Sequence, residues 1–178
     1  MRIIRQLANS DSGVSAVEFA FILPVMVIMF LGTVESSNYV MAARRVAADA
    51  SVAGDLVAQE SSISDADMAD VLGALNVVMA PLDSNVFQVT ITSVVAEANG
   101  TTYKVAWSEA RHATPRPVGS IVSGSVFPAG LIAAYQGAIM VEVAYGYDPL
   151  FADFLPRTDL TDTFYLKPRR SLTVTRTP

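Results

Sequence analysis

The chain has 178 residues, a formal net charge of −5 and no cysteine. The acidic balance and the scattered basic residues give no indication of a nucleic-acid surface. Without cysteine there is no disulfide framework, no thiolate metal site and no thiol nucleophile. Apolar residues make up 52% of the chain, and they are most concentrated in residues 14–34, a run of 21 residues in which Glu18 is the only ionisable side chain.

Residues 1–13 read as a short leader, in which Arg2 and Arg5 precede polar residues and Gly13. The apolar run that follows spans ~30 Å as a helix, the hydrocarbon thickness of a bilayer, so we predict a transmembrane helix over residues 14–34. A secretory signal peptide has a shorter apolar core and a cleavage site after it. Here the small polar junction precedes the core, and cleavage after Gly13 would make Val14 the N-terminus and Glu18 the fifth residue.

Placing Glu18 in a membrane costs free energy, because inserting an ionised carboxylate near the middle of a spanning helix costs ~2.5 to 3.5 kcal/mol. An intramembrane carboxylate is a functional candidate by default. The alternative is a tolerated charge that reaches the interface, since Glu18 lies about one turn from the start of the run. Pro24 predicts a kink near Ala20, although proline is also generally more frequent in membrane helices.

The distribution of arginines predicts the orientation of the span. Arg2 and Arg5 flank its N-terminal side, whereas Glu35 is the first residue after it and Arg44 follows only about three turns later. By the positive-inside rule the N-terminus is cytoplasmic. The remainder of the chain is then expected in the periplasm of a Gram-negative cell, attached to the inner membrane by one helix.

The helical pattern continues beyond the span as a stripe of small residues. This stripe predicts one helix from about Val14 to Gln59, with residues 35–60 outside the membrane. Its members are Val40, Ala43, Ala47, Ala50, Ala53 or Gly54, and Val57.

Residues 61–178 are predicted to form one soluble domain. Ser64 reads as the N-cap of a second helix that ends before Pro81. The expected buried face of that helix is Met68, Val71, Leu72, Leu75, Val78 and Met79.

The pattern then changes to alternation, which predicts strands. Residues 87–92 and 102–108, joined around Asn99-Gly100, predict an antiparallel hairpin. A third strand is expected over residues 139–147, and an edge or bulged strand over residues 164–175, interrupted at Pro168. Residues 110–136 predict a long loop with one helical turn at residues 129–135. The fold class is therefore α+β: a long membrane-spanning helix on a small domain with a second helix and an antiparallel sheet of about four strands.

Motifs for catalysis are not found in the sequence, so no enzyme, cofactor or small-molecule substrate is predicted. His112 is the only histidine and would need carboxylates from elsewhere to bind a metal, so no metal site is predicted. The acidic residues after Ser64 are better explained by helix capping than by a calcium loop. The basic cluster Lys167-Pro168-Arg169-Arg170 fits either a protected strand edge or a surface for an acidic partner.

The segment from Gly13 to Asp55 resembles the N-terminal region of the TadE/TadF family of tight-adherence (Flp) pilus pseudopilins. The core of the resemblance is AVEFAFILPV, Ala16 to Val25, and the spacing of Gly13, Glu18 and Phe19 is similar to that of a prepilin signal, a glycine followed five positions later by glutamate and an aromatic residue. The C-terminal segments VEVAYGYDPLF and FYLKPRRSLTV resemble the family's strands more loosely.

The resemblance implies a minor pseudopilin in the assembly of a tight-adherence pilus, cut between Gly13 and Val14 by a membrane prepilin peptidase. It also implies that Glu18 pairs with the new amine of Val14 on another subunit. The expected partners are the peptidase, other pilins and the assembly machinery. The rival interpretation is an unprocessed single-pass periplasmic binding or scaffold protein of the envelope; a membrane-anchored hydrolase would need a catalytic constellation that the sequence does not offer.

Overall fold

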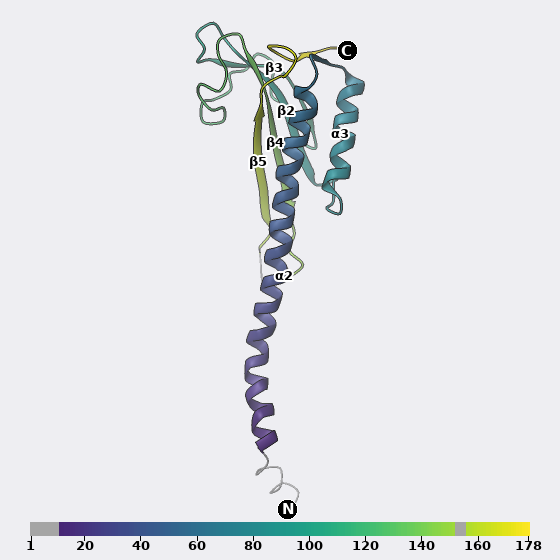
Figure 1. The fold of residues 1–178 in the computed structure, drawn as a ribbon, viewed down its shortest axis with the longest axis vertical. Helices are drawn as coiled ribbons and strands as arrows, with labels where there is room; N and C mark the ends of the chain where they lie inside the picture. Colours follow the sequence, from purple (N-terminus) through teal and green to yellow (C-terminus); the bar gives the residue numbers. More distant parts are fainter. Residues whose placement is uncertain (1–10, 152–155) are drawn as a thin grey trace, which may run out of the picture.

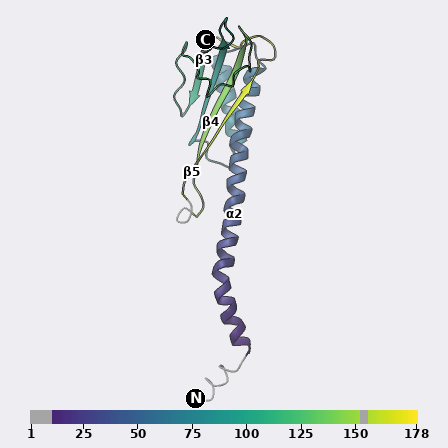
Figure 2. The same ribbon diagram turned by 90° about the vertical axis from the view of Figure 1, so that its left-hand side faces the viewer.

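The computed structural model describes residues 11–151 and 156–178, so that Arg2 and Arg5 of the predicted leader lie outside the described residues. A long helix runs the length of the molecule, and the other elements gather around its C-terminal part (Figure 1). In a view turned by 90° the sheet forms a layer beside this helix (Figure 2). The elements are α2 (Asp11–Ala58), β1 (Ser62–Ile63), α3 (Asp65–Met79), β2 (Phe87–Ala96), β3 (Tyr103–Arg111), β4 (Gly137–Tyr147), β5 (Thr158–Leu166) and β6 (Thr175–Arg176). The predicted α+β class is confirmed.

Helix α2 is the long helix that the sequence predicts. It begins at Asp11, before the predicted start at Val14, and ends at Ala58. The predicted cleavage junction therefore lies inside the helix. At the other end, the backbone N–H of Arg169 donates to the carbonyl of Ala58 at 2.8 Å, so the C-terminal part of the chain satisfies one of the last carbonyls of α2.

The predicted stripe on α2 is confirmed at Ala50, Ala53 and Val57, which are buried, and is wrong nearer the N-terminus of the helix. Val40 is 47% exposed, and Ala43 and Ala47 are only half-buried. The helix packs against the sheet on one side and against α3 on the other, so the centre of its buried face lies between these two partners. The spacing of small residues alone does not indicate where that centre lies. The fully buried apolar positions are Ala42, Val46, Ala50, Ala53, Val57 and Ala58.

The closest approach of α2 to the sheet occurs at Gly54. A Cβ atom added there would clash with Cδ1 of Leu166 on β5 and lie 3.4 Å from Cγ2 of Val141 on β4. Gly73 in α3 has no atom within 4 Å of the same added position. A side chain at Gly54 would therefore require the end of the Leu166 side chain to move, whereas a side chain at Gly73 would meet open space.

The two glycines predict different effects of alanine on the free energy of unfolding. Gly73→Ala should stabilise the protein by about 1 kcal/mol through helix propensity. Gly54→Ala should stabilise the protein less than this, because moving the Leu166 side chain aside costs free energy that offsets the same propensity gain. Urea unfolding of the full chain in detergent micelles, followed by the fluorescence of the buried Trp107, measures both. Equal effects of the two substitutions would contradict the packing at Gly54.

The main sheet has the order β3-β2-β4-β5 and every neighbouring pair is antiparallel. The predicted hairpin is confirmed as β2 and β3. Central strand β4 places alternate residues in the core against α2, as the alternation predicts. These residues are Ile139, Val141, Val143, Tyr145 and Tyr147.

The C-terminal strand and the long loop differ from the predictions. The edge strand β5 ends at Leu166, and only Thr175–Arg176 form a second short strand, which pairs in parallel with β1. The helical turn expected at residues 129–135 is absent, because Gly130 and Tyr135 have φ values of 79° and 64°, in the left-handed region that ends right-handed helices. Side chains of this loop instead cover a second hydrophobic cluster around Phe127.

The start of α3 is confirmed as predicted. The Ser64 side chain accepts a hydrogen bond from the backbone of Asp67 at 3.2 Å, and the Asp67 carboxylate accepts one from the backbone of Ser64 at 2.9 Å. This reciprocal capping box satisfies two donors at the start of the helix. The acidic pair after Ser64 is thereby explained as a helix start.

Candidate functional site

The N-terminal half of α2 is bare. Every residue from 13 to 30 is exposed, including Phe21 at 78% and Phe30 at 68%. Figure 1 shows no other element beside this part of the helix. Within the described residues, one helix, Gly13–Ala58, is long and apolar enough to cross a membrane, with a mean hydropathy of 2.4 in its most apolar window. An apolar surface of this size needs an apolar surrounding.

The predicted signal residues lie in the first turns of this bare helix. Gly13, Val14, Glu18 and Phe19 are all exposed. Val14 and Glu18 are four positions apart and therefore share one face of α2. The helix continues through Pro24, and the kink expected there stays a prediction.

Glu35 forms a contact that sequence reasoning missed. Its carboxylate is 3% exposed and accepts hydrogen bonds from the hydroxyl of Tyr147 and from the backbone N–H of Leu150, the latter at 3.1 Å. The ring of Tyr147 also meets that of Tyr39 edge-on, with centroids 5.7 Å apart. Burial, together with the hydrogen bond to Glu35, raises the pKa of the Tyr147 hydroxyl above its usual range. Glu35 thus fastens the end of β4 to α2 directly after the predicted span.

Asp49 is a second buried carboxylate on α2. It is fully buried, and neither of its oxygens has a hydrogen-bond partner among the described residues. Burial raises the pKa of Asp49 to about 7, opposed by the charge of Arg45. Arg45 itself points to the end of α3, where its Nη1 donates to the carbonyls of Val78, at 3.2 Å, and Ala80. This cation therefore complements the C-terminal end of α3 and leaves Asp49 without a direct partner.

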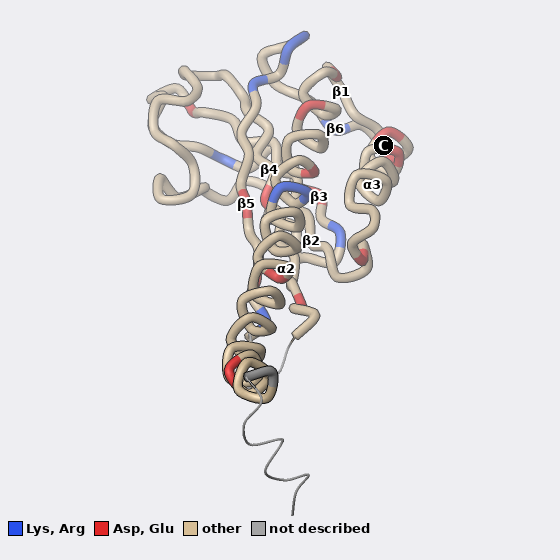
Figure 3. Tube along the Cα trace, turned by 60° about the horizontal axis from the view of Figure 1, so that its bottom comes forward, with Lys and Arg blue, Asp and Glu red and all other residues tan. Residues whose placement is uncertain are grey.

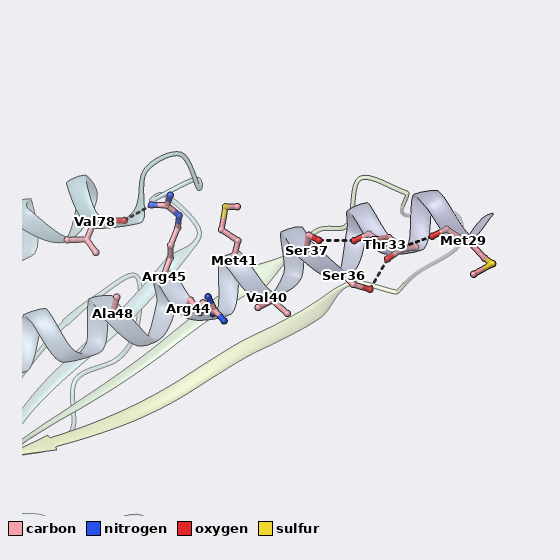
Figure 4. Close-up of a pocket in the computed structure, with 11 residues that line it drawn as sticks. Met29, Thr33, Ser36, Ser37, Val40, Met41, Arg44, Arg45, Ala48 and Val78 are labelled. Atoms are coloured by element: carbon pink, nitrogen blue, oxygen red, sulfur yellow. Dashed lines mark hydrogen bonds between the residues drawn. The ribbon is translucent and has the colours of Figure 1, made fainter. Parts of the chain in front are cut away.

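A groove runs along the face of α2 that the sheet leaves open, and α3 borders it (Figure 4). Three hydroxyl groups in it donate to carbonyls one turn earlier in the helix: Thr33 to Met29 at 2.8 Å, Ser36 to Gly32 at 2.7 Å and Ser37 to Thr33 at 2.9 Å. Their donors are satisfied within α2, so another helix can cover this face without leaving them unpaired.

The basic cluster at residues 167–170 lies directly after edge strand β5 and beside the end of α2. Arg169 forms an ion pair with Asp55 of α2. Figure 3 shows basic and acidic residues interspersed over the domain end of the molecule. Arg169 thus acts within the fold, as a contact between the C-terminal segment and α2.

Metal-binding chemistry receives no support from the described residues. Among them, no group of three or more His, Cys, Asp or Glu side chains is placed to hold a metal ion. Nδ1 of His112 lies 3.0 Å from the carbonyl oxygen of Phe87. The single histidine is therefore engaged by the backbone of a neighbouring strand.

Comparison with protein families gives one match. Residues 13–54 match the family of TadE-like proteins. No curated protein and no solved structure matches the chain. The resemblance seen in the sequence is thereby confirmed over the bare half of α2 and most of its packed half. The family match supports a part in tight-adherence pilus assembly.

Proposed function

We propose that this chain, whose residues 13–54 are TadE-like, is a minor pseudopilin that takes part in assembling a tight-adherence pilus. The observation that supports this best is the division of α2. Its TadE-like segment begins in a bare apolar helix and ends in a helix packed on a folded domain. That arrangement suits a subunit held in a membrane by one end, with the domain available for other subunits.

The proposal includes a division of the chain and an orientation. Residues 1–13 are a prepilin leader, 14–34 a membrane span, 35–60 a periplasmic continuation of the helix, and 61–178 the soluble domain. The N-terminus is cytoplasmic and the domain is periplasmic, anchored in the bacterial inner membrane by a single pass. The proposed partners are a prepilin peptidase, other pilins and the assembly machinery.

Glu18 would set the axial position of one subunit against the next. Cleavage after Gly13 creates a new amine at Val14, and a Glu18 carboxylate on a neighbouring subunit is a natural partner for it. In an apolar surrounding either charge alone is costly, while the pair attract strongly. Only one relative position of two subunits brings the Val14 amine and the Glu18 carboxylate together, so the ion pair stabilises that position.

The groove along α2 would receive helices of other subunits. Its small side chains, Gly32, Ser36 and Ser37 among them, allow the backbones of two helices to come close. Because the groove begins near the end of the predicted span and continues along the domain, it can guide packing both at the membrane surface and above it.

The N-terminus of the mature protein tests the proposal. In cells with an active prepilin peptidase, mass spectrometry should find an N-terminal peptide that begins at Val14, and peptidase-deficient cells should retain Met1. Gly13→Val should block cleavage, because a branched side chain replaces the small residue at the cleavage junction. Gly32→Val, with no atom near an added Cβ, is the matched control and should be processed normally. An intact Met1 in peptidase-active cells would instead support the unprocessed scaffold protein.

A further inference from the structure

The connection that leaves β4 reaches further along α2 toward its N-terminus than the rest of the sheet (Figure 1). Within this connection Leu150 is 71% exposed, and Phe151 is half-buried. The backbone N–H of Leu150 is held by the Glu35 carboxylate at 3.1 Å. The fold therefore places apolar side chains beside one defined residue of α2.

Glu35 directly follows the predicted span of residues 14–34. A residue bonded to it lies at the level where α2 leaves the hydrocarbon region. We propose that Pro149, Leu150 and Phe151, here called the β4 tip, contact the membrane in addition to α2, with their side chains in the interface of the periplasmic leaflet. This inference rests on the membrane anchoring in the proposed function and adds a surface of the soluble domain to it.

The chemistry of the β4 tip suits a lipid interface. The polar zone on each side of the hydrocarbon core is ~5 to 8 Å thick, about the reach of a leucine or phenylalanine side chain from a backbone at its edge. The Leu150 N–H is already satisfied by Glu35, so entering the interface leaves no unpaired donor there. Asp148, at the base of the tip, lies 3.5 Å from Nε of Arg157, which offsets its charge.

The aromatic residues around the tip add to this argument. Tyr39 lies one helical turn beyond Glu35 and is 39% exposed, and its ring packs edge-on against that of the buried Tyr147. Tyrosines gather at membrane interfaces because their rings are apolar and their hydroxyls polar. With α2 and the β4 tip both in contact with the bilayer, the soluble domain has a defined orientation to the membrane plane.

Leu172 provides a matched control at the other end of the sheet. It is 66% exposed, and its carbonyl accepts a hydrogen bond from Gly137, the first residue of β4. The β4 tip follows the last residue of the same strand. At ~3.3 Å per residue the ends of this strand are ~33 Å apart, so Leu172 lies far from the membrane.

The absence of cysteine makes a label-based experiment direct. Single variants Leu150→Cys, Leu172→Cys and Met26→Cys of the full chain carry a nitroxide label in vesicles of phosphatidylethanolamine and phosphatidylglycerol. Power-saturation electron paramagnetic resonance then compares access of oxygen, which partitions into lipid, with access of a water-soluble nickel chelate. Trp107 fluorescence confirms that each variant is folded.

We expect the ratio of oxygen to nickel access to be severalfold higher at position 150 than at position 172, and highest at position 26. An aqueous ratio at position 150, equal to that at 172, with a lipid-like ratio at 26, would overturn the membrane contact and leave the anchor intact. An aqueous ratio at position 26 would overturn the anchor itself, and with it both proposals.

Discussion

Replacing Glu18 by glutamine is expected to lower the recovery of this chain in assembled pilus complexes at least tenfold, measured among molecules cleaved after Gly13. Glutamine keeps the size and polarity of the side chain, removes its charge and replaces one accepting oxygen by a donating NH2 group. The amine of Val14 on the neighbouring subunit then stays uncompensated in an apolar surrounding. Breaking a buried ion pair in this way costs about 3 to 5 kcal/mol, which corresponds to more than a hundredfold in an equilibrium constant.

The measurement is quantitative immunoblotting of the chain in sheared or cross-linked pilus fractions, with the mature N-terminus determined from the same cells. Glu60→Gln is the control, since Glu60 is an exposed glutamate just beyond the end of α2. Glu18→Asp retains the charge and should restore part of the recovery. Normal recovery of Glu18→Gln would show that charge pairing has no role in assembly.

The second large effect is expected at Asp49. Its pKa is about 7 in the folded protein against a usual value of 3.8. Between these two pH values the folded protein keeps a proton on Asp49 that the unfolded chain releases. The contribution of Asp49 to stability is therefore greatest below about pH 4, falls as the pH rises to about 7, and is constant above that. The difference between a pKa of 3.8 and one of about 7 corresponds to a loss of about 4 kcal/mol.

Asp49→Asn should remove this part of the pH dependence and make the protein more stable than the wild type at pH 8. Asparagine stays neutral, so the cost of burying a charge disappears. Urea unfolding in detergent micelles at a series of pH values gives the difference between the two proteins. Asp70→Asn, at an exposed position on α3, is the control and should leave the profile unchanged. Parallel profiles for wild type and Asp49→Asn would contradict the shifted titration.

Local signals in the sequence predicted local structure well. The capping residues at Ser64 and Asp67 satisfy each other within one helical turn, and the alternation along β4 needs only that one face of the strand meets a core. The candidate segment around Gly13 and Glu18 is also local, because a leader, an apolar run and a single charge are consecutive in the chain. The family match begins at this same segment.

Contacts between distant parts of the chain were not predictable from local sequence signals. Glu35 and Tyr147 are separated by 112 positions, and nothing near either residue indicates the other. One interrupted strand was expected over residues 164–175, but β5 ends at Leu166. The chain then leaves the main sheet, and β6 pairs with β1 instead. On α2, Val40, Ala43 and Ala47 are not in the buried face as predicted, because the sheet and α3 pack on the helix from different sides.

By itself the sequence determined that an apolar helix with one carboxylate precedes an α+β domain, because hydropathy, periodicity and capping are properties of neighbouring residues. Only the tertiary structure decided which face of α2 the sheet covers, that Asp49 is buried without a hydrogen-bond partner among the described residues, and that Glu35 holds Leu150 beside the end of the predicted span. Burial and long-range hydrogen bonds depend on which segments meet in space, and this pairing is a property of the whole fold.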